Sequence, residues 1–202
     1  MKSKIIQLVA WDMEDTLIPK AQIESEKGTR IIRANALELL SSDRDRYIIN
    51  ERIELNPGVR EVLNATSHNY IQNGIISGFA YQPGLNLIIG ARLSNYINPR
   101  LIELAHKHAW EEMVLAGKDY DQALDEWKKP SIKMFQELIR KFRENYGEIS
   151  PEQCLYFGDN ERDQSTACEA GWKYMDIKEV AEFKNKEDRE VYENLIVHML
   201  KK

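Results

Sequence analysis

Apolar residues gather in short continuous runs along this chain, and the first run, residues 5–11, is rich in β-branched residues. Only Gln7 interrupts it before the run ends at Asp12. A short apolar run of this kind predicts a strand buried on both faces, as in a parallel sheet. Similar strands are predicted at 75–78, 153–157 and 172–177.

Between these runs, apolar residues recur at intervals of three and four, the spacing of a helix with one buried face. The clearest such helix ends near Gly147, and its apolar positions are Ile132, Phe135, Leu138, Ile139 and Phe142. Another is predicted to begin at Asn56 as its N-cap, with Pro57 in the first turn. Strands that alternate with helices predict a doubly wound α/β sheet.

Other elements follow from weaker patterns. One helix is expected to begin near Thr29, and others at 84–96, 99–108, 166–170 and 187–200. The apolar residues 113–116 are interpreted as a further strand, stopped by Gly117.

Composition excludes some classes of protein. The 202 residues are 43% hydrophobic and 30% charged, with a net charge of -5, as expected for a globular domain with one good core. The acidic balance argues against a nucleic-acid partner, because neutralising phosphates needs a basic excess. No apolar run reaches membrane-spanning length, and the two cysteines, Cys154 and Cys168, are interpreted as free thiols. A cytoplasmic location without a membrane partner is expected.

Carboxylates follow the first predicted strand directly, at Asp12, Glu14 and Asp15. Ligands of open α/β folds bind at the carboxyl edge of the sheet. A carboxylate pair such as Asp12 and Glu14 can hold a divalent cation, or divide into a nucleophile and an acid or base. The alternative for this stretch alone is a solvated acidic turn.

Four segments together resemble the motifs of the haloacid dehalogenase (HAD) superfamily of phosphotransfer enzymes. That family has a strand ending in Asp-x-Asp-x-Thr, a strand ending in Ser or Thr, a Lys often followed by Pro, and commonly Gly-Asp-x-x-x-Asp. The matching segments are 12–16, Ser77, Lys129-Pro130 and 158–163. The resemblance covers about residues 5–177 and implies an HAD-like Rossmannoid core with a mostly parallel sheet, similar to the small-cap, magnesium-dependent phosphatase subgroup.

The resemblance also implies roles for these residues. Asp12 would be the nucleophile that forms an aspartyl-phosphate, and Glu14 the acid/base. Mg²⁺ would be held by Asp12, the backbone carbonyl of Glu14 and Asp159, with support from Asp163. The phosphate-binding residues would be Thr16, Ser77, Gly78 and Lys129, with Lys128 as an alternative to Lys129.

Glu14 departs from the family pattern, because an aspartate is usual at that position. Its side chain is one methylene longer, and a small misplacement of a catalytic group can cost about a hundredfold in rate. The first hypothesis is therefore a Mg²⁺-dependent phosphomonoesterase, and the alternative is a weakly active or inactive binding or regulatory protein of the same fold. A receiver-type signalling domain is disfavoured because the nucleophile here follows the first strand, and a dehalogenase because Asp159 and Asp163 would lack a purpose.

The expected organisation is a single domain, 1–202, with a small cap insertion at 18–55 and a possible helical insertion at 97–126. Such a cap leaves the site open, which would suit a small phosphorylated metabolite or a phosphoprotein side chain. Neither the substrate nor the oligomeric state follows from the sequence.

Overall fold

The first strand of the chain lies at the centre of a parallel sheet. The structure, a computed structural model, describes residues 5–19, 54–78 and 92–201. Within them, one five-stranded sheet has the order β3-β2-β1-β4-β5, and all of its pairs are parallel. The strands are β1 (Leu8–Trp11), β2 (Gln72–Ser77), β3 (Ile97–Leu104), β4 (Cys154–Gly158) and β5 (Lys173–Asp176).

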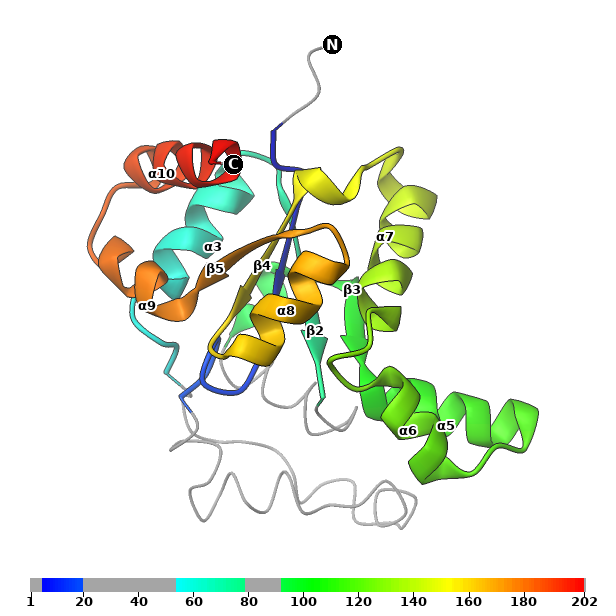
Figure 1. Ribbon diagram of the computed structural model, residues 1–202. Coiled ribbons are helices and arrows are strands. Elements are labelled where there is room, and N and C mark those ends of the chain that lie inside the picture. Colours follow the sequence, from blue (N-terminus) through cyan, green and yellow to red (C-terminus); the bar gives the residue numbers. More distant parts are fainter. Residues whose placement is uncertain (1–4, 20–53, 79–91, 202) are drawn as a thin grey trace.

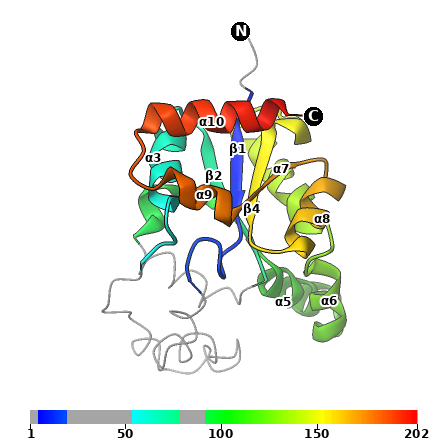
Figure 2. The ribbon, with the colours of Figure 1, turned by 60° about the vertical axis from the view of Figure 1, so that its left-hand side comes forward.

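Helices cover both faces of this sheet (Figures 1 and 2). One face is covered by α3 (Val59–His68), α9 (Ile177–Val180) and α10 (Asp188–Leu200). The other is covered by α7 (Lys133–Tyr146) and α8 (Glu161–Glu169), while α5 (Ala105–Ala116) and α6 (Tyr120–Trp127) pack against each other beyond the end of β3. Short 3-10 turns are η3 (Leu93–Asn95), η4 (Pro151–Gln153) and η5 (Ala181–Phe183). The predicted doubly wound α/β fold is confirmed.

The central strand β1 explains the continuous apolar run at the start of the chain. Successive side chains of a strand point to opposite faces. Val9 and Trp11 pack into the core beneath α3 and α10, whereas Leu8 and Ala10 pack into the core beneath α7. All four side chains are fully buried, so neither face of β1 has room for a polar residue.

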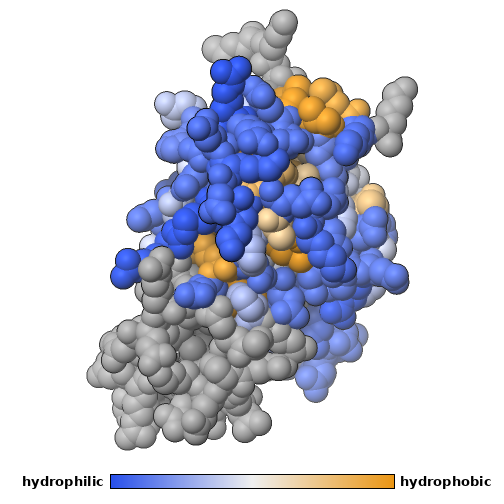
Figure 3. Space-filling view, turned by 90° about the vertical axis from the view of Figure 1, so that its left-hand side faces the viewer, coloured by the Kyte–Doolittle hydropathy of each residue, from blue (hydrophilic) through white to orange (hydrophobic). Residues whose placement is uncertain are grey.

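The amphipathic helices agree with the sequence pattern. Helix α7 buries Phe135, Leu138 and Phe142 and ends before Gly147, as predicted. Helix α10 buries Val191, Leu195 and Met199 at four-residue intervals. The outer surface on that side is mostly hydrophilic (Figure 3). Among the helices of the described ranges, none is long and apolar enough to cross a membrane.

The predicted helix at 99–108 is wrong, because most of this stretch belongs to strand β3. Its apolar residues Leu101, Ile102 and Leu104 fit a helical spacing, but they pack against β2 and its neighbours instead. Pro99 supported the helix prediction, because proline is common at the first position of a helix. It is tolerated here because β3 is an edge strand, and the pairing with β2 shifts register around it, between Ile97 and Ile102.

The predicted strand at 113–116 is also wrong, because these residues form the last turn of α5. Their apolar run suggested a buried strand, yet Val114 is 59% exposed and Leu115 is 84% exposed. Helix α5 ends at Gly117, which has a φ of 66°. The apolar run therefore lies at the exposed end of a helix and does not enter the sheet.

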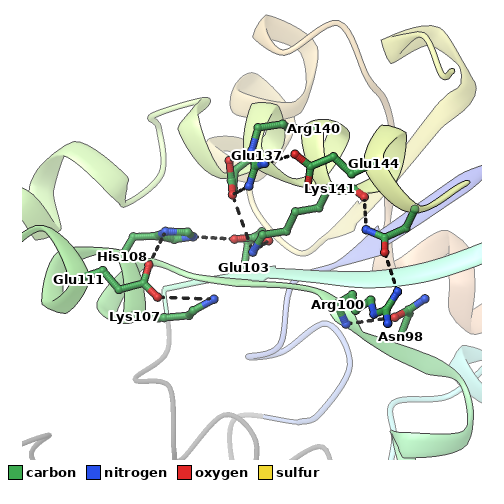
Figure 4. A network of polar contacts seen from close by, with 11 residues as sticks. Asn98, Arg100, Glu103, Lys107, His108, Glu111, Glu137, Arg140, Lys141 and Glu144 are labelled. Carbon is green, nitrogen blue, oxygen red and sulfur yellow. Dashed lines mark hydrogen bonds and ion pairs between the residues drawn. The ribbon is translucent and has the colours of Figure 1, made fainter. Parts of the chain in front are cut away.

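A buried carboxylate joins the edge strand to two helices (Figure 4). Glu103 on β3 is fully buried. One of its oxygens lies 2.5 Å from Lys141 Nζ of α7, and the other lies 2.5 Å from His108 Nε2 of α5. The His108 ring stacks on Trp127 at 3.9 Å, and Trp127 is the last residue of α6. This network fixes the end of α6, from which the chain continues to Lys129.

Several predicted elements lie outside the described residues. These are the helix near Thr29, most of the helix at 84–96 and nearly all of the insertion at 18–55. The stretch 97–126 contains β3, α5 and all but the last residue of α6.

Candidate functional site

The site lies at the carboxyl ends of the three neighbouring strands β2, β1 and β4. Asp12 follows β1, Ser77 ends β2, and Asp159 follows β4. Because the strands are parallel, these ends meet at one edge of the sheet. Lys129 reaches the same place from the loop between α6 and α7.

The turn after β1 is tightly held. Asp15 N donates to Ile18 O at 2.9 Å, and Ile18 N donates to Met13 O at 3.0 Å. Asp15 has a φ of 56°. Asn56 Nδ2 donates to the carbonyl oxygens of Asp15 and Thr16, at 2.8 and 2.9 Å. These bonds fix the path of the segment that carries Asp12.

Asn56 is therefore not the helix cap that the sequence predicts. The N-cap of α3 is Gly58, with a φ of 80°, and it makes no side-chain cap bond. A Cβ at Gly58 would lie 1.8 Å from Val180 O, so no larger residue fits there. The helix start is set by this close approach, which leaves Asn56 to bind the turn after β1.

Lys129 is the centre of a buried polar cluster. Its Nζ donates to Asp12 Oδ1 at 2.8 Å, to Asp163 Oδ1 at 2.5 Å and to Tyr156 OH at 3.0 Å. The two carboxylate side chains are 9% and 0% exposed, and the lysine side chain is 6% exposed. Burial alone lowers the pKa of Lys129, but the adjacent charges of Asp12 and Asp163 outweigh it and raise that pKa. The lysine therefore stays a cation.

Three carboxylates converge beside this lysine. Asp12, Asp159 and Asp163 each offer one oxygen, and these oxygens lie within 4.8 Å of one another. Burial raises the pKa of Asp12, although Lys129 opposes the shift. Burial, together with the charges of Asp12 and Asp163, raises the pKa of Asp159 to about 6. A further cation would relieve this repulsion, and clustered hard oxygen donors fit Mg²⁺.

The start of α8 explains the spacing of the Gly-Asp-x-x-x-Asp motif. Asn160 is the N-cap, and its Oδ1 accepts from Asp163 N at 3.0 Å. Its Nδ2 donates to Asp159 Oδ1 at 2.8 Å and to Asp163 Oδ2 at 3.1 Å. A Cβ at Gly158 would lie 2.6 Å from Asp163 Cβ. The glycine therefore leaves room for Asp163, and Asn160 orients both carboxylates.

The remaining predicted residues are placed as follows. Ser77 is buried, and Glu14 lies half-buried in the turn after β1. Thr16 Oγ1 is buried, and no hydrogen-bond partner for it is found in the part of the chain that the structure describes. Gly78 is exposed and borders the undescribed residues 79–91.

The structure distinguishes between the two adjacent lysines. The Lys128 side chain is 45% exposed and lies 3.8 Å from Asp125 Oδ1, on the surface. Lys129 is the lysine that enters the carboxylate cluster. Sequence reasoning did not single out Asn160 or Tyr156. Asn160 could have been recognised as a helix cap beside the motif, whereas nothing local marks Tyr156.

Comparison with known proteins places this arrangement in a family. A family model described as polynucleotide kinase 3 phosphatase matches residues 7–195. No curated protein gives a significant match. An HAD-superfamily hydrolase from Ehrlichia chaffeensis superimposes with a TM-score of 0.54 at 18% identity, over 98% of this chain and 100% of that one.

Two further solved structures share the fold. A beta-phosphoglucomutase from Clostridium difficile gives a TM-score of 0.56 at 14% identity, over 95% of this chain and 99% of that one. CbbY from Rhodobacter sphaeroides, solved in complex with phosphate, gives 0.53 at 13% identity, over 85% of each chain. With the family match across nearly the whole sequence, the chain belongs to the polynucleotide kinase 3 phosphatase family, and it has the fold of HAD-superfamily hydrolases.

Proposed function

We propose that this protein is a Mg²⁺-dependent phosphomonoesterase that uses Asp12 as its nucleophile. The observation that carries the proposal is the cluster of Asp12, Asp159 and Asp163 beside Lys129, in which Asp12 and Asp163 are buried and Asp159 is half-buried. Burying two carboxylates, with a third half-buried, beside one lysine is costly unless a further positive charge is bound. A divalent cation and a phosphoryl group together match this arrangement. The positive charge of the cation and the negative charge of the phosphoryl group partly neutralise each other.

The reaction proceeds in two displacements. An Asp12 carboxylate oxygen attacks phosphorus, the ester P–O bond breaks, and its electron pair stays on the leaving oxygen. Glu14 gives this oxygen a proton, so an alcohol departs and an aspartyl-phosphate remains. Water then attacks the phosphorus and Glu14 takes its proton. The bond between phosphorus and the Asp12 oxygen breaks with its electron pair on that oxygen, which releases orthophosphate and restores the Asp12 carboxylate.

The surrounding residues bind and neutralise the phosphoryl group. Lys129 donates to its oxygens, as do the Ser77 hydroxyl and the backbone near Gly78, with Thr16 beside them. Asp12, the Glu14 carbonyl and Asp159 hold the cation, and Asp163 supports both the cation and Lys129. Bound Mg²⁺ supplies charge neutralisation for the phosphoryl oxygens.

The substrate class is proposed from the domain organisation of the chain. We infer a single domain, 1–202, with a small cap at 18–55 and an added helical segment at 97–126 near the site. A small cap suits a phosphorylated metabolite or a phosphoprotein side chain. CbbY was also solved in complex with xylulose-1,5-bisphosphate, and the family's description adds polynucleotide 3′-phosphates as a test substrate. The net charge of -5 favours the small metabolite over the nucleic acid.

Metal removal tests the proposal directly. Phosphatase activity on a panel of sugar phosphates, phosphopeptides and a 3′-phosphorylated oligonucleotide should vanish in excess EDTA and return when Mg²⁺ is restored. The reason is that the carboxylate cluster repels a phosphate dianion until a cation neutralises it. Full activity in the chelator would exclude this site as the metal-dependent centre.

The role of Glu14 is tested with leaving groups of different basicity. An alkoxide needs a proton as it departs, whereas nitrophenolate leaves without one. Glu14→Ala should therefore lower phosphoryl-enzyme formation by about a hundredfold or more on an alkyl phosphate, and much less on p-nitrophenyl phosphate. Glu14→Asp should keep activity on both substrates. No loss with Glu14→Ala on either substrate would favour the alternative, a weakly active regulatory protein.

A further inference from the structure

Tyr156 lies in the middle of β4, fully buried on the side of the sheet that α7 covers. Its ring packs edge-on against Phe135 of α7, with centroids 4.9 Å apart at 66°. The residue paired with it on the central strand is Ala10. The small Ala10 side chain leaves room for the phenol ring to extend over β1.

The Tyr156 hydroxyl connects two parts of the site. It accepts a hydrogen bond from Lys129 Nζ at 3.0 Å and donates one to Ile76 O at 3.2 Å. Ile76 lies on β2, on the far side of β1 from β4, and directly precedes Ser77. A single hydroxyl thus links the lysine to the strand end that carries Ser77.

An ammonium group has three N–H donors, and Lys129 directs them to Asp12, Asp163 and Tyr156. The two carboxylates provide charge, whereas the tyrosine provides a fixed neutral acceptor. Burial and the charges of Asp12 and Asp163 raise the pKa of Tyr156, so the hydroxyl keeps its proton and goes on donating to Ile76 O.

We propose that Tyr156 is a positioning residue, which acts through Lys129 by holding the ammonium group where the phosphoryl oxygens bind. This rests on the proposed function, in which Lys129 binds phosphate. Without the hydroxyl, the carboxylates of Asp12 and Asp163 are the hydrogen-bond partners of Nζ that remain among the described residues, and both change their interactions when a cation and a phosphoryl group bind. The hydroxyl is the one partner of Nζ that takes no part in either event.

A purely structural role makes a different prediction. If Tyr156 only fills the core, phenylalanine replaces it with some loss of stability and with unchanged kinetics per folded molecule. If Tyr156 acts through Lys129, its hydroxyl matters only while the lysine is present. A double-mutant cycle separates these two cases.

The experiment compares the wild type, Tyr156→Phe, Lys129→Gln and the double variant. Each is measured for kcat and KM, and for the dissociation constant of orthophosphate by calorimetry with Mg²⁺ present. Tyr156→Phe should lower kcat/KM, and weaken orthophosphate binding, by about tenfold, the size expected for a hydrogen bond to a charged group. In the Lys129→Gln background the same change should cost less than about twofold.

Tyr120→Phe is the matched control. It removes another tyrosine hydroxyl that bonds a side chain, His106 Nδ1 at 2.6 Å, from α6 outside the cluster. It should leave both constants unchanged. If Lys129→Gln does not fold, as judged by circular dichroism, Lys129→Met supplies the second background, because it also removes the ammonium group. The loss of kcat/KM in Tyr156→Phe alone still separates the positioning role from a purely structural role, which predicts unchanged kinetics.

The outcomes are distinguishable. Equal losses from Tyr156→Phe in both backgrounds, or no loss in either, would overturn the positioning role while leaving the phosphatase proposal intact. A wild type without turnover on any substrate would overturn the phosphatase proposal, and the orthophosphate cycle would still decide the role of Tyr156. A wild type that shows neither turnover nor orthophosphate binding would overturn both.

Discussion

Replacing Asp12 with asparagine is expected to lower turnover by about four to six orders of magnitude, because the amide cannot form the aspartyl-phosphate. The fold should survive. Asparagine has nearly the same shape, and its amide oxygen can still accept from Lys129 Nζ, which lies 2.8 Å from Asp12 Oδ1. Steady-state rates, urea denaturation, and mass spectrometry of the phosphorylated intermediate would measure this.

Asp176→Asn is the matched control for that variant. Asp176 ends the edge strand β5 and caps α9, accepting from Lys178 N at 2.8 Å, but it does not belong to the carboxylate cluster. Asparagine is an equally good cap, so rate and stability should both stay near wild type. Turnover retained in Asp12→Asn would place the phosphoryl acceptor at another residue.

Lys129→Met should produce the largest loss of stability. The change removes the cation that pairs with Asp12 and Asp163 while keeping the length of the side chain. Leaving a buried charge without its partner costs about 3–5 kcal/mol in the free energy of unfolding. Urea denaturation in EDTA would measure the loss of stability. Adding Mg²⁺ should restore part of it, because the bound metal cation then neutralises the same carboxylates.

Lys128→Met provides the comparison for this experiment. The adjacent Lys128 is 45% exposed and pairs only loosely with Asp125 Oδ1, at 3.8 Å. Such surface pairs contribute between about 0 and 1 kcal/mol. The free energy of unfolding of Lys128→Met should therefore stay close to that of the wild type. Similar losses in the two variants would mean that Lys129 does not neutralise the cluster.

The sequence predicts those elements whose burial is uniform along their length. Strands β1 and β4 are apolar throughout because both of their faces are covered, and α7 is periodic because it packs on one side only. Strand β3 and helix α5 lack this uniformity. Pro99 and Arg100 are exposed on an edge strand, and Leu115 is exposed at the end of a helix, so periodicity there misleads.

Much of the candidate site was predictable because two of its carboxylates, Asp12 and Asp159, follow strands directly. Asp12, Asp159 and Asp163 occupy recognisable motifs, and Lys129 is marked by Pro130. Residues that act through distant partners carry no such mark. Tyr156 resembles any core aromatic residue until the fold brings it to Lys129. Asn56 resembles a helix cap until it is seen to bind the Asp15 and Thr16 carbonyls.

The central position of β1 has a consequence for how the molecule folds. Leu8 pairs on one side with Gln72 and on the other with Cys154, so the earliest strand completes its pairing only with one of the last. Contacts so far apart in sequence are slow to form, because a long loop must first be closed. A nascent chain that has not yet reached β4 therefore leaves the backbone groups along one edge of the apolar strand β1 unpaired. During synthesis, this edge is where we expect aggregation to begin and chaperones to bind.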